Sequence, residues 1–138
     1  MHDDDDLLDE EVLIVTLLKA AMPDVTFTTT PTSLSAKKLP YAVIQSSELD
    51  DAVDALGQRW LFEITSSHET REQSKRLAMD IFSLMGKFHR ETAGSTELGY
   101  INEVTRFKPQ RYSTTAESSV GREHLYHYHA RYDIEVAS

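Results

Sequence analysis

The chain has 138 residues, of which 40% are hydrophobic and 27% are charged, a composition typical of one ordinary globular domain. It contains no cysteine, which excludes disulfide bonds and thiolate metal sites. The longest apolar run is far shorter than a membrane span, and the acidic N-terminus is the opposite of the basic start of a signal peptide. We therefore expect a cytoplasmic protein without a membrane partner.

The net charge of −9 comes mostly from the N-terminus. Seven of the 23 acidic residues lie within the first eleven positions, and without them 16 acidic residues face 14 basic ones, a balance of −2. A nearly neutral domain lacks the basic face that sequence-independent DNA binding requires. We interpret residues 1–7 as an acidic flexible tail and residues 8–138 as a single domain. No glycine turn gathers the consecutive aspartates of the tail into a calcium loop.

The first half of the chain predicts one helix and two strands. An apolar stripe predicts a helix from Leu8 to Ala21, and Pro23 stops it. A short β-prone run extends from Val25 to Thr29, and a second strand is expected from Tyr41 to Gln45. The acidic stretch from Glu48 to Gln58 is expected to be a loop between two antiparallel strands.

A strand followed by a long helix occupies the middle of the chain. The strand is expected from Arg59 to Thr65, and its alternating apolar face carries Trp60, Phe62 and Ile64. Residues 66–69 are expected to turn the chain into a helix whose apolar stripe consists of Leu77, Ala78, Ile81, Leu84, Met85 and Phe88. Two residue pairs have the spacing of a capping box at its start, namely Thr70 with Gln73 and Ser66 with Glu69.

The strand expected from Tyr100 to Phe107 has no purely apolar side, which predicts an edge strand or a face shared with a partner. One side would carry Ile101, Glu103, Thr105 and Phe107, and the other Tyr100, Asn102, Val104 and Arg106. The polar segment from Lys108 to Glu123 is long for a loop, and we expect it to order against a neighbour.

The final strand, expected from Leu125 to Val136, has the most regular alternation in the chain. The face expected to cover the helices carries Tyr126, Tyr128, Ala130, Tyr132, Ile134 and Val136. The opposite, polar face carries His127, His129, Arg131, Asp133 and Glu135. A slip of one residue would bury this polar face, so the register of the strand is firmly set.

His127 and His129 are the strongest candidates for chemistry, because an i, i+2 pair on one strand face has ligand-like geometry for zinc or copper. A third ligand would have to come from a neighbouring strand, where Glu63 and Glu103 are candidates. The competing interpretation is a polar face directed at solvent or at a partner. No serine lies in a glycine-flanked nucleophile elbow, and the five glycines form no phosphate-binding loop. We therefore expect neither an enzyme nor a bound metal or cofactor.

The order of these elements resembles the tail terminator (tail completion) proteins of long-tailed bacteriophages. The resemblance covers about Leu8 to Val136 and rests on the stretches LIVTLLKAAMPDVTF, PYAVIQSSELDD, GQRWLFEITSSHETREQSKRLAMDIFSLM and HARYDIEV. It is a pattern of elements and spacings, and it carries over no catalytic residue. The resemblance implies an α+β fold in which a mostly antiparallel sheet of about four to five strands has two helices packed on one face.

The resemblance also implies a structural virion protein that forms a ring, expected to be a homohexamer, at the head-proximal end of a tail tube. Such a ring stops polymerisation of the major tail tube protein and offers a docking surface to a head-side connector or stopper protein. DNA passes through it without specific binding. The ring would assemble in the host cytoplasm and end in the virion.

Two alternatives to the terminator stay open. The first is another head–tail joining protein, a stopper or an adaptor, with a similar stoichiometry. The second is a small metal- or ligand-binding α+β domain that uses His127 and His129.

A closed ring needs two different patches on each subunit, because its contacts run head to tail. The candidate interface residues lie in the mixed strand, in the long polar segment and on the polar face of the final strand: Arg106, Arg111, Tyr112, Arg122, His127, His129 and Arg131.

Overall fold

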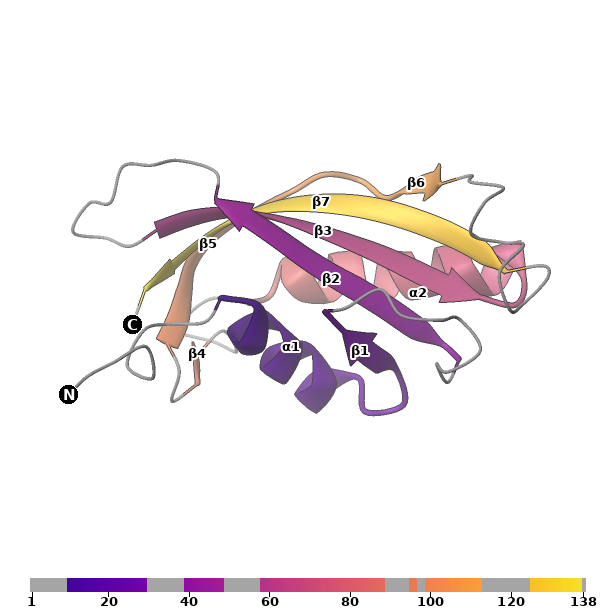
Figure 1. Ribbon diagram of the computed structural model, residues 1–138, viewed down its shortest axis with the longest axis horizontal. Coiled ribbons are helices and arrows are strands. Elements are labelled where there is room, and N and C mark those ends of the chain that lie inside the picture. The colour runs from indigo at the N-terminus through magenta and orange to yellow at the C-terminus, as the bar shows by residue number, and fades with distance from the viewer. Residues whose placement is uncertain are drawn as a thin grey trace.

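The computed structural model describes residues 10–29, 39–48, 58–88, 95–96, 99–112 and 125–137. Within these residues two helices and seven strands follow one another in the order α1 (Glu10–Ala21), β1 (Thr26–Thr28), β2 (Tyr41–Glu48), β3 (Gln58–His68), α2 (Arg71–Met85), β4 (Ser95–Thr96), β5 (Gly99–Arg106), β6 (Gln110–Tyr112) and β7 (Tyr126–Ala137). The expected α+β class is confirmed (Figure 1). The expected acidic tail and the acidic loop lie outside the described residues, apart from the loop's first and last positions.

One curled sheet contains all seven strands. Its order is β1-β2-β3-β7-β5-β4, and β6 pairs with β7 beyond the end of β5. The pairs are antiparallel except for β1 with β2. The five strands expected from the sequence are all present, and the short strands β4 and β6 extend the sheet beyond the expected four to five.

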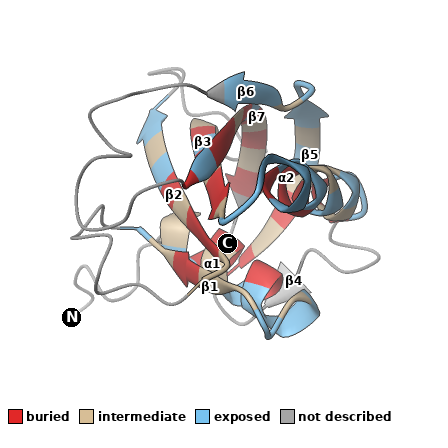
Figure 2. Ribbon diagram, turned by 90° about the vertical axis from the view of Figure 1, so that its right-hand side faces the viewer, coloured by how far each residue is buried: buried red, intermediate tan, exposed pale blue. Residues whose placement is uncertain are grey.

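The core lies between one face of the sheet and the two helices. Trp60, Phe62 and Ile64 of β3 stand opposite Ile134, Tyr132 and Ala130 of β7, as the two alternations predict. Helix α2 packs against β3 and β7, and α1 packs against β1 and β2. Figure 2 shows the buried parts of β2, β3, β5 and β7 gathered around the helices. Neither described helix is long and apolar enough to cross a membrane.

Strand β3 is longer than expected, because residues 66–68 continue the sheet instead of turning. Ser66 and Ser67 pair with Tyr128 and His127 of β7, and the Ser66 carbonyl accepts a hydrogen bond from Ser74 Oγ of α2 at 3.1 Å. The chain turns only at residues 69–70. There Thr70 Oγ1 accepts the backbone N–H of Gln73 at 3.1 Å, so the first of the two capping boxes is confirmed and the second is wrong.

A β-bulge explains the mixed alternation of β5. Ile101 stands opposite Val136, and the register then shifts so that Glu103 faces Glu135 and Val104 faces Ile134. The extra residue, Asn102, therefore reverses the faces of everything after it. Ile101, Val104 and Arg106 share the helix-covered face, whereas Glu103 and Thr105 share the outer one, so the grouping expected from strict alternation is wrong.

The segment from Lys108 to Glu123 is not wholly irregular. Residues 110–112 form β6, which pairs with residues 127–129 of β7. Pro109 has no N–H to donate, and the ladder is interrupted at this position between β5 and β6. Phe107 keeps the chain in place there, because its N–H donates to the Arg131 carbonyl at 3.1 Å. Residues 113–124 lie outside the described part of the chain.

Both outer edges of the sheet have only short strands among the described residues. Among the described strands, β4 pairs with β5 at Gly99 and Tyr100 and none pairs with its outer edge further along, as expected of an edge strand. On the other side, β1 covers β2 only as far as Val43. Past that point the carboxylates of Glu10 and Glu11 hold Ser46, whose N–H donates to Glu11 Oε2 at 2.8 Å and whose Oγ lies 2.7 Å from both side chains.

Ile81 tests the packing of α2 on the sheet. Its side chain is 1% exposed within the core, so Ile81→Ala should lower the free energy of unfolding by about 2–5 kcal/mol through the cavity it leaves. Val12 is 43% exposed on α1, and Val12→Ala should change that free energy by less than about 0.5 kcal/mol. Urea denaturation measures both, and equal losses would contradict this position of α2.

Tyr132 gives the fold a specific response to alkali. Its side chain is fully buried, and its hydroxyl has no hydrogen-bond partner among the described residues. Burial raises the pKa of the phenol above its usual 10.0, and the charge of Arg106 opposes this shift only in part. The folded state favours the neutral phenol. The contribution of Tyr132 to the free energy of unfolding is therefore complete below about pH 10, and it is lost as the pH rises further through the raised pKa.

Tyr132→Phe should therefore leave stability at pH 7 within about 1 kcal/mol of the parent protein, because no described hydrogen bond is lost. Above about pH 10 the variant should lose stability less steeply than the parent. Urea denaturation at neutral and alkaline pH measures both slopes, and parallel slopes would show that the phenol is not held neutral.

Candidate functional site

The face of β3 and β7 that points away from the helices is polar, and its side chains pair across the strands. Thr65 Oγ1 lies 3.2 Å from His129 Nδ1, and Ser67 Oγ lies 2.6 Å from His127 Nδ1. The Nε2 atom of His129 is 3.5 Å from Glu63 Oε2. Each histidine therefore contacts a hydroxyl of β3 through its own Nδ1 atom.

These contacts do not assemble a metal centre. The two histidines lie on one strand face as expected, and Glu63 reaches His129, but Glu103 stands opposite Glu135, far along the sheet from both rings. Among the residues that the structure describes, no group of three or more histidine, aspartate or glutamate side chains could hold a metal ion.

His127 is buried, contrary to the expectation of a surface that faces solvent or a partner. It is 5% exposed and lies in one row with Ser67 and Tyr41, which are 1% and 2% exposed. The row lies on the face that the alternation marks as polar, so the period of two identifies the face correctly but not its solvent access. His129, two residues along, is about one-third exposed.

The Ser67–His127 contact pairs a hydroxyl with an imidazole, as a catalytic serine–histidine dyad does, but its surroundings favour a structural pair. The same contact recurs between Thr65 and His129 one row along the strands, as in a ladder of cross-strand polar pairs. Ser67 is also only 1% exposed, so in this structure its hydroxyl is not accessible to a substrate.

Arg131 and Arg106 are engaged within the protomer. The guanidinium of Arg131 donates to both carboxylate oxygens of Asp133 at 2.9 and 3.2 Å, and this pairing raises the pKa of Arg131, which stays charged. Arg106 lies on the helix side, where it donates to the Phe82 carbonyl at 2.9 Å and stacks 4.3 Å from the Phe82 ring. Any side chain at Gly86 would collide with its guanidinium, so Gly86 leaves room for this contact.

The other interface candidates are spread over the chain. Arg111 is exposed on β6, and Tyr112 is the last residue of that strand, opposite His127. Arg122 lies outside the described residues. Tyr126, expected on the buried face, is 37% exposed at the start of β7, where Arg71 lies 5.6 Å from its ring centroid. Among the described candidates, His127, His129 and Arg131 share the outer face of β7 and Tyr112 pairs with His127, whereas Arg106 lies on the helix side.

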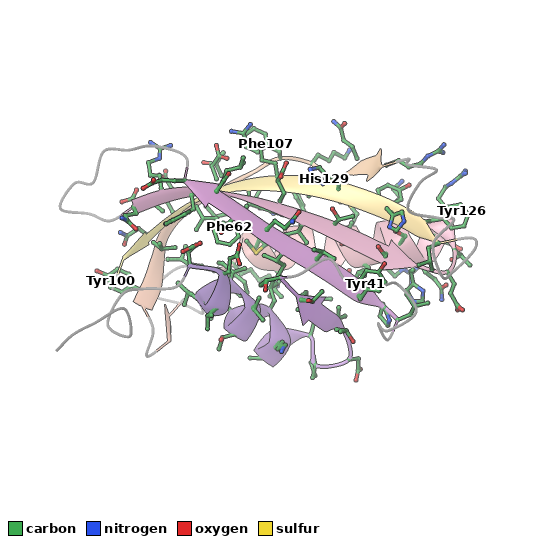
Figure 3. The ribbon with its side chains drawn as sticks, in the orientation of Figure 1. Tyr41, Phe62, Tyr100, Phe107, Tyr126 and His129 are labelled. Carbon is green, nitrogen blue, oxygen red and sulfur yellow. The ribbon has the colours of Figure 1, made fainter. Side chains whose placement is uncertain are left out.

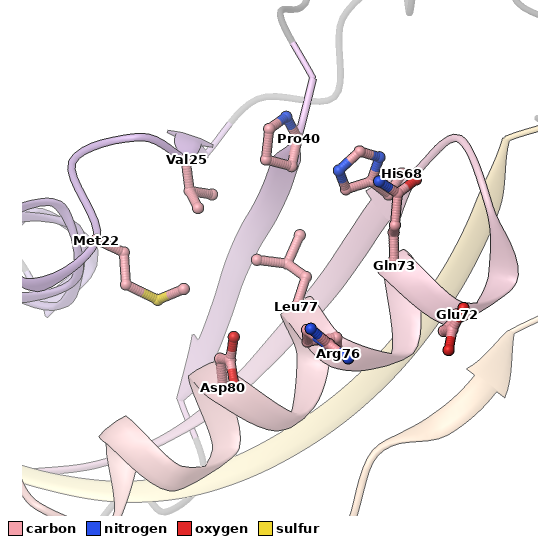
Figure 4. A pocket seen from close by; sticks show the side chains of 9 residues that line it. All are labelled: Met22, Val25, Pro40, His68, Glu72, Gln73, Arg76, Leu77 and Asp80. Atoms are coloured by element: carbon pink, nitrogen blue, oxygen red, sulfur yellow. The ribbon is translucent and has the colours of Figure 1, made fainter.

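A groove that the sequence does not suggest lies on the helix side of the molecule (Figure 4). It has a volume of about 420 Å³ and lies between the α1–β1 junction and the first half of α2. Four residues give it an apolar lining: Met22, Val25, Pro40 and Leu77. They come from three separate places in the sequence, since Met22 and Val25 belong to one turn, and the fold brings these places together.

The polar rim of this groove is acidic on balance. Glu72, Arg76 and Asp80 line it from successive turns of α2, and Gln73 and His68 complete it. All three charged side chains are exposed. The i, i+4, i+8 spacing of these charges is visible in the sequence, but it also fits an ordinary solvated helix face and so identifies no groove.

The comparisons with known proteins add no relative. No protein-family model matches the chain, and no curated protein matches its sequence.

The two cross-strand pairs should differ in their contribution to stability. Ser67→Ala removes a buried partner of His127 and should lower the free energy of unfolding by about 1–3 kcal/mol, because a desolvated polar group loses a hydrogen bond. Thr65→Ala is the matched control, since His129 can still meet water, and should cost less than about 1 kcal/mol. Thermal and urea unfolding measure both. A larger loss for Thr65→Ala would contradict the structural interpretation of the buried pair.

Proposed function

We propose that this protein is a ring-forming structural subunit of a phage tail, a tail terminator, and not an enzyme. The order of its elements resembles that family, and the observed α+β architecture, with two helices on one face of a largely antiparallel sheet, agrees with what the resemblance implies.

The observation that carries the proposal is that the polar groups of the described outer face bind one another. His129 meets Thr65 and Glu63, and Arg131 meets Asp133, so these groups are arranged to stabilise a sheet and do not converge on a vacant reaction centre. An active site needs groups that are positioned but left available for a substrate. A building block needs only a stable face and edges that neighbours can contact.

The partners follow from this role. Identical subunits would close into a ring, expected to be a hexamer, on the end of the major tail tube protein, and a head-side connector or stopper protein would dock on its other side. The nearly neutral body of the chain is compatible with DNA that passes without specific binding. The assembled protein would belong to the head-proximal end of the virion tail.

The terminator proposal is tested by solution mass and by tube length. Light scattering should give about six times the 15.7 kDa protomer mass, and negative-stain images should show rings. Added to polymerising tube protein, the ring should bind tube ends and stop growth. Rings that bind only a head-side protein would instead identify a stopper or adaptor.

A protomer that stays single at high concentration and turns over a small molecule would refute the proposal. Elemental analysis of the same sample separates the metal-binding alternative. A stoichiometric metal that is lost on His129→Ala would favour a domain that uses His127 and His129.

A further inference from the structure

Phe107 is an exposed aromatic side chain in a fixed position. It is 42% exposed, and its own N–H anchors the joint between β5 and β6 by donating to the Arg131 carbonyl at 3.1 Å. The Arg131 guanidinium lies 5.0 Å from the ring centroid, and the neighbouring Lys108 is exposed. Figure 3 places Phe107 on the side of the sheet away from the helices. Phe107 and Lys108 thus form an aromatic knob with a cationic neighbour.

The groove beside α2 is also apolar, but the charge at its rim is of the opposite sign. Its lining is apolar at Met22, Val25, Pro40 and Leu77. Its rim carries the carboxylates of Glu72 and Asp80 with Arg76 between them, an excess of one negative charge. A phenyl ring inserted there would move out of water and pack against the apolar lining. The Lys108 ammonium group would at the same time approach a carboxylate, which favours one orientation over others.

We propose that Phe107 of one protomer inserts into the groove of the next, so that the knob and the groove form the head-to-tail contact of the ring; this inference rests on the function proposed above. The knob lies on the outer side of the sheet and the groove on the helix side. Two unlike patches on different sides of one subunit generate a heterologous contact, which a two-fold dimer does not need but a ring does.

Phe107 would be the anchor of this contact and not its whole area. An aromatic side chain buries about 150–250 Å², a small share of the roughly 1,600 Å² of a standard interface. Such anchors nevertheless carry most of the binding free energy, because they are fully desolvated at the centre of the contact. The knob also needs little ordering on association, since the backbone bond to Arg131 already fixes it.

The first test compares two exposed aromatic residues in the full-length protein. Phe107→Ala should weaken ring assembly by roughly 30-fold or more in a dilution series followed by light scattering. Tyr126→Ala, at 37% exposure a matched control, should leave assembly within about threefold of the parent. At a dilution where the parent is also dissociated, both variants should keep the parent's unfolding midpoint, because neither side chain lies in the core.

The second test uses the absence of cysteine from the chain. Lys108→Cys and Asp80→Cys are prepared separately, both at exposed positions, and treated with a short thiol-reactive bifunctional cross-linker. Each variant alone should give no cross-linked dimer, whereas the mixture should give a dimer that contains one chain of each. Adding Phe107→Ala to the Lys108→Cys chain should abolish the product.

The outcomes separate this inference from the proposed function. Rings that form normally with Phe107→Ala, together with no cross-link in the mixture, would overturn the docking of Phe107 and leave the terminator proposal standing. A cross-link with either variant alone would also overturn it, since like residues would then meet. A parent protein that forms no ring would refute both.

Discussion

Strand β7 fixes the fold because both halves of the sheet depend on it. Eleven residues of β3 pair with one edge of β7, and β5 and β6 pair with the other. Its alternation directs Tyr132 and Ile134 into the core and Arg131 and Asp133 outward. A slip of one residue would exchange these sets and bury a charged pair, so the register is set by a large free-energy difference. The positions of all outer-face groups follow from that register.

The two edges of the sheet differ in how they are covered, and this difference is compatible with the proposed head-to-tail contact. On the β2 edge, two glutamates from the first turn of α1 bind Ser46, so carboxylates occupy a backbone donor that a foreign strand would otherwise use. On the β5 side, the bulge at Asn102 sets which face each later residue occupies, and the strand ends at Arg106, so that Phe107 follows on the outer face. The two edges of the subunit therefore differ, which is compatible with the proposed head-to-tail contact between two unlike patches.

Regular patterns predicted the fold, and irregular residues limited the prediction. The alternation in β3 and β7 and the stripe of α2 correctly located the core, because each reflects one buried face. The faces of β5 were mispredicted because a bulge has no reliable sequence signal, and β6 was missed because three residues pair only where β7 already provides an edge. The groove was missed because tertiary packing brings the Met22–Val25 turn together with Pro40 and Leu77. The burial of His127 was missed because alternation distinguishes two faces but does not report what covers them.

The polar outer face and the proposed apolar contact would play separate roles, and this separation accounts for two histidines that share a strand face without forming a site. His129 already bonds Thr65 and lies 3.5 Å from Glu63, and Arg131 already bonds Asp133. A partner that docked there would have to replace these contacts and would gain little. Removing the phenyl ring of Phe107 from water breaks no hydrogen bond, and its one described electrostatic contact is with the Arg131 guanidinium, 5.0 Å from its centroid. Affinity between subunits should therefore come from Phe107 and the groove beside α2, whereas the ladder of polar pairs should keep the sheet rigid enough to hold the phenyl ring of Phe107 in position.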